Sequence, residues 1–376
     1  MKDTIYILFF LWFFCGCNQE PEKQRELIKL EKLSYASNFT IQNQKEYTLV
    51  TIDTPYKNAE KGLRYVLYPR DGEKPSIEAD AYIPVPVQSI VCTSTTHIPL
   101  LDYLGETDRL VGFPTLDYIS SEKMRAQIDS GFVAELGIDN AINIEKLIEL
   151  NPDLVMAYTM TSDFGQFNKM QEAGIPVLIN AEYMELNPLG RAEWIKLAGL
   201  LFGKEAKADS IFKMIESEYV VTKEKVKEVH DFPTAMSGSM YSDTWYLPGG
   251  NNYAAKLLTD AGFEYIWHQD TTSGFLALSY EAVLDKANKA DFWIGASNFK
   301  SLNEMKEANE RYSFFAPFEM SQVYSYDKRI GAKGGSEFLE LGYLRPDLIL
   351  KDLVKIGHPE LLPEHESFFY FKLPEN

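Results

Sequence analysis

Histidine and cysteine residues, which could hold a metal ion or act in catalysis, are few and widely spaced in this sequence. The five histidines stand at positions 97, 230, 268, 358 and 365, and no His-x-x-x-His or Cys-x-x-Cys pair occurs. A zinc site needs three or four such ligands that converge. The Gly-x-Ser-x-Gly elbow, the phosphate-binding glycine loop and the His-Glu-x-x-His helix are also missing from the sequence. We therefore predict no catalytic residue, no metal site and no resident cofactor.

Aromatic and hydroxyl side chains follow several segments that we expect to be β-strands. In open α/β sheets, ligands bind where the carboxyl ends of strands meet the N-termini of helices. Aromatic rings offer large flat surfaces to a ligand, and Tyr and Trp add a polar tip. The candidates for ligand contact are Thr95, Thr96, His97, Tyr118, Tyr158, Trp245, Tyr246, Phe275 and Tyr326. The neighbouring positions Asp117, Thr159 and Tyr324 belong to the same strand ends.

Two glutamates occupy matching positions in an internal repeat. The segment 143–157 contains a polar capping residue, Glu145 two residues later, an amphipathic stretch and then an apolar strand. The segment 279–295 repeats this order, with Glu281 in the matching place. A lone acid in a first helical turn is usually explained by the helix dipole. The matched pair suggests, in addition, one functional glutamate in each half of the chain.

Length and charge restrict the possible fold and partners. The 376 residues contain 55 acidic and 37 basic side chains, which gives a formal charge of −18, and 45% of the residues are hydrophobic. Such a chain favours two lobes, each with its own core. An acidic excess of this size repels phosphate backbones and gives no counterion release. We therefore expect no nucleic-acid partner.

The N-terminus has the pattern of a targeting segment. An apolar run from Ile5 to Cys15 is shorter than the roughly 20 residues that a membrane-spanning helix needs, and it suits the core of a signal peptide. The following Gly16-Cys17 resembles the bacterial lipobox, although Phe14 replaces the usual Leu. This resemblance implies a signal peptide over residues 1–16 and lipidation at Cys17. The polar segment 17–37 is then a tether, with an ordinary secreted protein as the alternative.

The remaining chain divides into two α/β lobes and a helical connection. Residues 38–191 are expected to form an N-terminal lobe, whose first part, 38–85, is a β-rich extension at its edge. Short strands then alternate with helices, as in a parallel sheet covered by helices. Residues 192–229 are expected to form a long linking helix with Gly203 as a break, and 230–376 a C-terminal lobe. The fold class is thus α/β, with two Rossmann-like lobes, a rigid linking helix and a ligand cleft between the lobes.

From Val87 to Leu362 the sequence resembles the substrate-binding lipoproteins of ABC importers for iron chelates, haem and cobalamin. The resemblance rests on the strand and helix from Val91 to Gly112, the two repeated segments, Leu247-Pro248-Gly249-Gly250, and Arg345-Pro346-Asp347-Leu348. The chain departs from the family at the first strand end, where Ser94-Thr95-Thr96-His97 replaces Ser-Pro-x-x-Thr-Glu. Ligand contacts at that position are therefore not transferred from the family.

The resemblance implies a transport protein, not an enzyme. It implies that Glu145 and Glu281 dock into a dimeric ABC permease, which works with ATPase subunits. The expected cargo is a small-molecule metal chelate, namely a ferric siderophore, haem or cobalamin, and His97 is a possible axial or hydrogen-bonding group for it. The expected location is the cell envelope, anchored to a membrane and facing the periplasm or the exterior. A lipid-anchored hydrolase and a binder of bare transition-metal ions are the alternatives.

Overall fold

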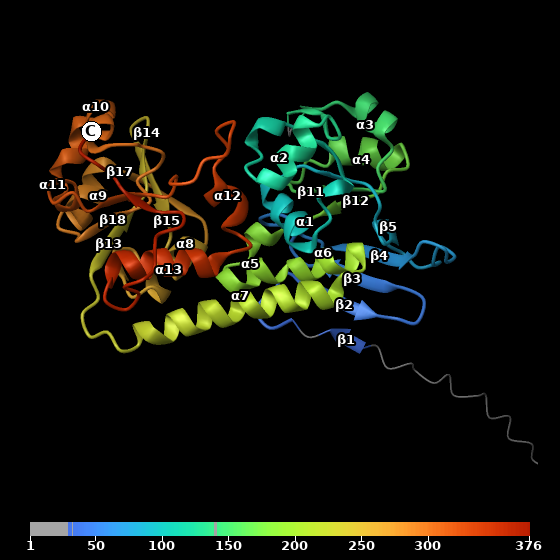
Figure 1. Ribbon diagram of the computed structural model, residues 1–376, viewed down its shortest axis with the longest axis horizontal. Coiled ribbons are helices and arrows are strands. Elements are labelled where there is room, and N and C mark those ends of the chain that lie inside the picture. Colours follow the sequence, from blue (N-terminus) through green and yellow to red (C-terminus); the bar gives the residue numbers. More distant parts are fainter. Residues whose placement is uncertain (1–28, 32, 139–140) are drawn as a thin grey trace, which may run out of the picture.

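The computed structural model describes residues 29–31, 33–138 and 141–376. The expected signal peptide, Cys17 and most of the expected tether lie outside the described residues. Two lobes lie side by side above a long helix, α7 (Figure 1). Within the described part of the chain, no helix has both the length and the apolar character required to cross a membrane.

The N-terminal lobe is built on a five-stranded parallel sheet. Its strand order is β12-β11-β6-β7-β8, and every neighbouring pair is parallel. The strands are β6 (Ile90–Cys92), β7 (Leu110–Phe113), β8 (Ala134–Glu135), β11 (Leu154–Ala157) and β12 (Val177–Ile179). The helices between them are α1 (Ile98–Leu104), α2 (Glu122–Asp129), α3 (Ile144–Leu150) and α4 (Gly165–Glu172). A short antiparallel pair, β9 (Gly137–Ile138) and β10 (Ala141–Ile142), precedes α3.

The C-terminal lobe repeats this plan and adds a second sheet. Its main sheet has the order β16-β13-β18-β19-β20, in which only β20 is antiparallel among the described strands. These strands are β13 (Thr234–Ser237), β16 (Glu264–Tyr265), β18 (Phe292–Ile294), β19 (Val323–Ser325) and β20 (Phe371–Lys372). The added antiparallel sheet contains β14 (Ser239–Tyr241), β15 (Thr244–Pro248) and β17 (Phe275–Ser279). The helices are α8 (Tyr253–Asp260), α9 (Tyr280–Ala287), α10 (Leu302–Ala308), α11 (Ala316–Glu319), α12 (Glu337–Leu341) and α13 (Pro346–Gly357).

In each lobe, similar hydrogen bonds from an aspartate join the starts of two neighbouring strands, β6 and β11 in one lobe and β13 and β18 in the other. In the N-terminal lobe, the Asp153 backbone N–H donates to Ser89 Oγ at 3.0 Å, and the Asp153 carboxylate accepts from the Gln88 N–H at 2.8 Å. In the C-terminal lobe, the Asp291 N–H donates to Thr234 Oγ1 at 3.0 Å, and its carboxylate accepts from the Thr234 N–H at 2.8 Å. The two lobes are therefore structural repeats. This agrees with the predicted class of two α/β lobes.

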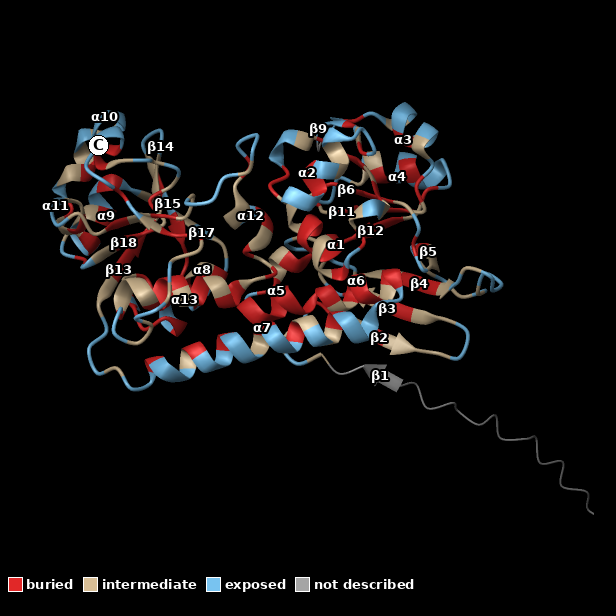
Figure 2. Cartoon of the chain, viewed as in Figure 1, coloured by how far each residue is buried: buried red, intermediate tan, exposed pale blue. Residues whose placement is uncertain are grey.

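Three helices connect the lobes where the sequence suggested one long helix with a break. They are α5 (Pro188–Glu193), α6 (Ile195–Phe202) and α7 (Glu205–Val226). Gly203 ends α6 with a φ of 63°, a left-handed conformation that glycine adopts readily. The 22 residues of α7 span about 33 Å at 1.5 Å each. A buried stripe along α7 packs against α6 of one lobe and α13 of the other, while its outer side is exposed (Figure 2).

The β-rich extension of the N-terminal lobe forms a sheet of its own, separate from the lobe's parallel sheet. Its order is β1-β2-β3-β4-β5, and the strands are β1 (Lys29–Glu31), β2 (Phe39–Asn43), β3 (Thr48–Ile52), β4 (Leu63–Pro69) and β5 (Ala81–Val85). Its inner face joins the lobe's core: the Phe39 ring lies 4.6 Å from that of Trp194, and Tyr65 Oη accepts from the Ile179 N–H at 3.0 Å. The extension thus packs against the edge strand β12 and the junction between α5 and α6.

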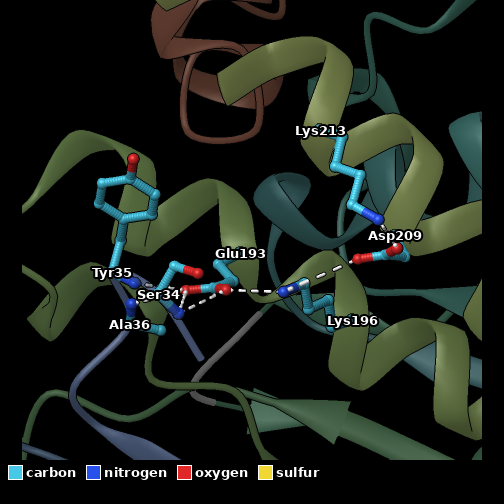
Figure 3. A network of polar contacts seen from close by, with 7 residues as sticks. All are labelled: Ser34, Tyr35, Ala36, Glu193, Lys196, Asp209 and Lys213. Carbon is cyan, nitrogen blue, oxygen red and sulfur yellow. Dashed lines mark hydrogen bonds and ion pairs between the residues drawn. The ribbon is translucent and has the colours of Figure 1, made fainter. Parts of the chain in front are cut away.

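Two buried carboxylates hold residues 34–38, which are the last four residues of the expected tether 17–37 and the first residue of the N-terminal lobe. Glu193 accepts the backbone N–H groups of Ser34, Tyr35 and Ala36 at 2.8 to 3.1 Å, and Lys196 pairs with it at 2.8 Å (Figure 3). Glu185 accepts from the N–H groups of Ser37 and Asn38 and from Trp194 Nε1. Both carboxylates are about 99% buried or more. The last residues of the expected tether are therefore fixed, to Glu193 of α5 and to Glu185, which precedes that helix.

Candidate functional site

The cleft between the lobes contains a large cavity. Its volume is about 1150 Å³, slightly above the typical range of about 300–1,000 Å³ for ligand pockets. One wall comes from α1 and α2 of the N-terminal lobe, and the opposite wall comes from Lys328–Ala332 and α12 of the C-terminal lobe. Lys207 of α7 and Phe368 complete the lining. The cavity is therefore shared by both lobes and the linking helix, as expected for a two-lobe binding protein.

A second cavity, of about 490 Å³, lies at the carboxyl end of β11. Thr93, the residues Tyr158–Thr161 and the beginning of α4 line it. Of the residues predicted from the sequence, Tyr158 and Thr159 belong to this cavity. Tyr158 is half-buried and Thr159 is buried. The structure thus places these two residues in a recess of the N-terminal lobe.

The first strand end is more buried than the sequence suggested. Thr95 and Thr96 are half-buried in a 3-10 turn that follows β6, and Thr96 Oγ1 donates to the Glu182 carboxylate at 2.5 Å. His97 has no exposed surface, and burial lowers the pKa of its imidazole to about 3. This corrects the assignment of His97 as a ligand contact, because α12 and α1 pack against its turn and cover it.

Aromatic residues of the C-terminal lobe divide between an exposed face and the core. Tyr246 and Phe275 are 44% and 69% exposed, and the pairing of β15 with β17 puts them on the same face of the small sheet. Trp245 is fully buried on the opposite face, where its ring lies 5.2 Å from that of Trp293. Its Nε1 donates to the Ser237 carbonyl at 3.1 Å. The assignment of Trp245 as a ligand contact is therefore corrected, and Trp245 belongs to the core.

Two further predicted residues, Tyr118 and Tyr326, do not line the large cavity but stand two residues before segments that do. Tyr118 follows β7 and is 60% exposed. Tyr326 follows β19, is half-buried and stacks on Phe338 of α12 with the ring centroids 4.6 Å apart. The structure therefore brings Tyr118 and Tyr326 to the segments that face each other across the cleft, while Tyr246 and Phe275 lie on the separate small sheet.

Basic groups in the large cavity are mostly engaged. Arg329 pairs with Glu337 at 2.6 Å, Lys123 with Asp102 at 2.6 Å, and Arg125 with Asp129 at 3.0 Å. Lys207 Nζ donates to the Leu104 carbonyl at 2.8 Å, and Lys328 Nζ donates to the Ser367 carbonyl. The lining therefore combines five cations with five carboxylates, in a protein whose net charge is −18.

Three buried polar residues were not predicted from the sequence. Glu340 of α12 accepts from the backbone N–H groups of Ser120 and Ser121 at 2.6 and 2.9 Å. Glu182 is buried beside Thr96, and burial raises its carboxyl pKa to about 7. Arg191 of α5 lies between two rings of the C-terminal lobe, 3.8 Å from the Tyr253 centroid and 4.3 Å from that of Tyr343. Their partners are distant in sequence, so no local pattern could have identified them.

The two repeated glutamates occupy equivalent and exposed positions. Glu145 is the second residue of α3, after the capping residue Asn143, whose side chain accepts from the Lys146 N–H at 2.9 Å. Glu281 is the second residue of α9, after Ser279, which accepts from the Ala282 N–H at 3.2 Å. Helices α3 and α9 lie in different lobes, and both are separated from α7 (Figure 1). Each lobe therefore presents one carboxylate at the N-terminus of a matching helix.

Cysteine and metal-ligating residues form no cluster in the described ranges. Within residues 29–31, 33–138 and 141–376, no group of three or more His, Cys, Asp or Glu side chains is arranged to hold a metal ion. Cys92 is free and buried in β6, and burial raises the pKa of its thiol. The site offers aromatic, hydroxyl and charged groups in a cleft instead.

This arrangement agrees with sequence comparison. Residues 90–329 match the model of a family described as periplasmic binding protein, which covers most of the chain. The chain belongs to the periplasmic binding protein family. Members of this family bind solutes for transport, so the prediction that the protein is not an enzyme is confirmed.

Relatives of this periplasmic binding protein include two lipoproteins and several solved structures. An uncharacterised lipoprotein of Methanocaldococcus jannaschii is 26% identical over 94% of this chain and 87% of its own length. An ABC transporter substrate-binding lipoprotein of Bacillus subtilis is 28% identical over 38% of this chain and 43% of its own. A possible iron-binding periplasmic solute-binding protein of Staphylococcus epidermidis has a TM-score of 0.57 at 17% identity, covering 73% of this chain and 99% of its own. The structural likeness confirms the two-lobe fold.

Proposed function

We propose that this periplasmic binding protein is the substrate-binding lipoprotein of an ABC importer for an iron chelate or cobalamin. It would capture a ferric siderophore, haem or the related corrinoid cobalamin in the cleft and deliver it to a permease dimer driven by ATPase subunits. The chelate is cargo, and we propose no resident cofactor. The proposed location is the cell envelope, with Cys17 as the lipid-anchored residue and the protein facing the periplasm or the exterior.

The observation that carries this proposal is the placement of Glu145 and Glu281 on the two structural repeats. Both are exposed, both stand second in a capped helix, and each belongs to a different lobe. A permease dimer offers two equivalent faces, and a two-lobe protein with one carboxylate per lobe has the matching arrangement. The names of the B. subtilis and S. epidermidis relatives, which refer to an ABC transporter and to iron binding, support the same class.

The shape of the cleft supports a ligand as large as a metal chelate. The cavity of about 1150 Å³ is bounded by both lobes, and the exposed rings of Tyr246 and Phe275 offer an additional flat surface. Lobe motion is expected to be small, because α7 packs against helices of both lobes and resists bending. Binding is therefore expected to require only a modest closure.

Ligand titration tests this proposed function directly. The full chain would be dialysed against haem, a catecholate ferric siderophore, a hydroxamate ferric siderophore and cobalamin, with the absorbance of each chelate as the readout. Saturable binding of one of the four with one ligand per chain is the expected result. Failure of all four to bind would contradict the proposed substrate class.

The exposed aromatic face supplies a second expected result. Changing Tyr246 and Phe275 to Ala removes two rings that a flat ligand could cover, and burying a ring of this size is worth about 1.5–3 kcal/mol. We expect the double variant to bind the chelate at least about tenfold more weakly in the same dialysis experiment. Phe232→Ala removes a 46% exposed ring next to the far end of α7 and should leave the affinity unchanged. Equal affinities in all three proteins would exclude this face from ligand contact.

A further inference from the structure

The segment Asp327–Leu341 leaves the C-terminal lobe after β19 and crosses toward the N-terminal lobe. Figure 1 shows it, with α12, rising between the two lobes. Ile330 and Ser336 form a β-bridge, the Gly331 N–H donates to the Gly335 carbonyl at 2.8 Å, and Ser336 Oγ donates to the Asp327 carboxylate at 2.7 Å. The segment is therefore an ordered hairpin-like arm with its own hydrogen bonds.

The backbone of the arm lies in close contact with the backbone of the N-terminal lobe. A Cβ atom added to Gly335 would come within 2.2 Å of the Tyr118 carbonyl oxygen, and one added to Gly331 within 2.7 Å of the Ser120 Cα. No side chain fits at either contact without displacement of the backbone. Two glycines therefore permit the close approach of the arm to the strand end after β7.

Glu340, near the end of the arm, joins it to the N-terminal lobe by hydrogen bonds. Its side chain is 2% exposed, and its carboxylate accepts from the N–H groups of Ser120 and Ser121 and from Ser120 Oγ at 3.2 Å. These three bonds join residues about 220 positions apart across the cleft. Their loss would leave two backbone donors of the N-terminal lobe without a protein acceptor, which costs about 1–3 kcal/mol each when the donor stays buried.

We propose that Asp327–Leu341 is a latch, in which Glu340 locks the C-terminal lobe onto Tyr118–Ser121 and releases when the lobes separate. The arm and the N-terminal helices form opposite walls of the large cavity, so release of the latch widens that cavity. Lobe separation is a property of the chain without ligand. It can therefore be tested independently of the proposed function.

The surroundings of Glu340 give the latch a pH dependence. Burial raises the pKa of the Glu340 carboxyl from 4.5 to about 7, and Glu337 on the same helix adds to the increase. A carboxyl with a higher pKa in the closed form than in the separated form favours closure at low pH. The ratio of separated to closed molecules should therefore rise by up to about tenfold per pH unit until pH 7.

Other ionisable groups lie near the latch on each element packed against it. On the N-terminal lobe, Asp102 accepts from Ser121 Oγ and Lys123, and Arg125 pairs with Asp129. On the C-terminal lobe Arg329 pairs with Glu337, Lys328 lies on the arm, and α7 contributes Lys207. His97 has its pKa lowered to about 3 and stays neutral above pH 5. Glu182, whose pKa is also raised to about 7, is the group that needs a control.

Distance measurement between the lobes tests the latch. Glu145→Cys and Glu281→Cys would place one spin label on each lobe of the full chain. Cys15 and Cys17 would be changed to Ser so that they carry no label. Cys92 is buried and is not labelled. We expect a longer mean distance at pH 7.5 than at pH 5. Glu340→Ala should give the longer distance at both pH values, and Glu340→Gln should remove the pH response.

Two further variants make the test decisive. Gly335→Val leaves Glu340 in place but inserts a side chain against the Tyr118 carbonyl, so it should also give the longer distance. Glu182→Gln should keep the pH response of the parent chain. The proposal is overturned if Glu340→Ala and Gly335→Val keep the parent distance at pH 5, or if Glu182→Gln alone abolishes the pH response.

Discussion

Changing both Glu145 and Glu281 to Lys is expected to abolish chelate uptake while leaving chelate affinity unchanged. Both carboxylates are exposed and neither belongs to the cavity lining, so the change should leave the ligand site intact. At a protein interface, loss of one partner of a buried charge pair costs about 2–5 kcal/mol, and like charges are repulsive. Two reversed charges should therefore reduce uptake by at least about 100-fold. Uptake of the chelate by cells that carry only the variant is the measurement, and dialysis gives the affinity.

The same helices provide matched controls for this experiment. Glu149 of α3 and Asp285 of α9 are exposed carboxylates outside the first turn. Changing both to Lys gives the same net charge as the docking variant but should leave uptake nearly unchanged. Normal uptake in the Glu145 and Glu281 variant, or an equal loss in the control, would exclude a specific docking role for the two repeated glutamates.

Glu185→Ala combined with Glu193→Ala is expected to cause the largest loss of stability. These buried carboxylates accept all the backbone N–H groups from Ser34 to Asn38, and Glu193 also pairs with Lys196. Removing one partner of a buried ion pair typically costs about 3–5 kcal/mol, because the remaining charge and donors are left without partners. We expect the free energy of unfolding to fall by at least about 3 kcal/mol. Urea unfolding followed by tryptophan fluorescence measures it, since Trp194 lies beside both groups.

Two comparisons show whether residues 34–38 cause the effect. Removing residues 1–28 keeps every one of these donors and should leave the free energy of unfolding unchanged. Glu224→Ala removes an exposed carboxylate from an ion pair on α7, and such pairs contribute about 0–1 kcal/mol. A double variant as stable as these two controls would show that the carboxylates do not fix the N-terminal segment.

The alternation of strands and helices could be predicted from the sequence because it depends on local patterns. The apolar strands and the capped helices around Asn143 and Ser279 lie where these patterns indicated, and so does the break at Gly203. Residues 38–85 were expected to be β-rich, and β2 to β5 lie there, while β1 falls in the segment expected to be a tether. The independence of this sheet from the lobe's sheet depends on pairing partners, which a single sequence does not reveal.

The candidate site was harder to predict, because burial depends on contacts between distant segments. Trp245 and Tyr246 are neighbours on one strand, and one of any two such neighbours faces the core. Composition alone could not decide which one. His97 follows its strand as expected, but α12, which is 240 residues later, covers it. Glu340, Glu185 and Glu193 look like ordinary acids in sequence, and their roles come from backbone donors elsewhere in the chain.

The attachment of residues 34–38 to Glu193 of α5 and to Glu185 has a mechanical consequence. A pull on the N-terminal end of the chain acts first on β1, which pairs with β2, and then on Glu193 and Glu185 through their hydrogen bonds to residues 34–38. Helix α5 stands between the lobes, and its Arg191 lies against two rings of the C-terminal lobe. The force therefore acts between the lobes and not at the outer end of either lobe. A load applied there exerts little torque on the lobes, so a molecule held by its N-terminus could open and close as freely as an unattached one.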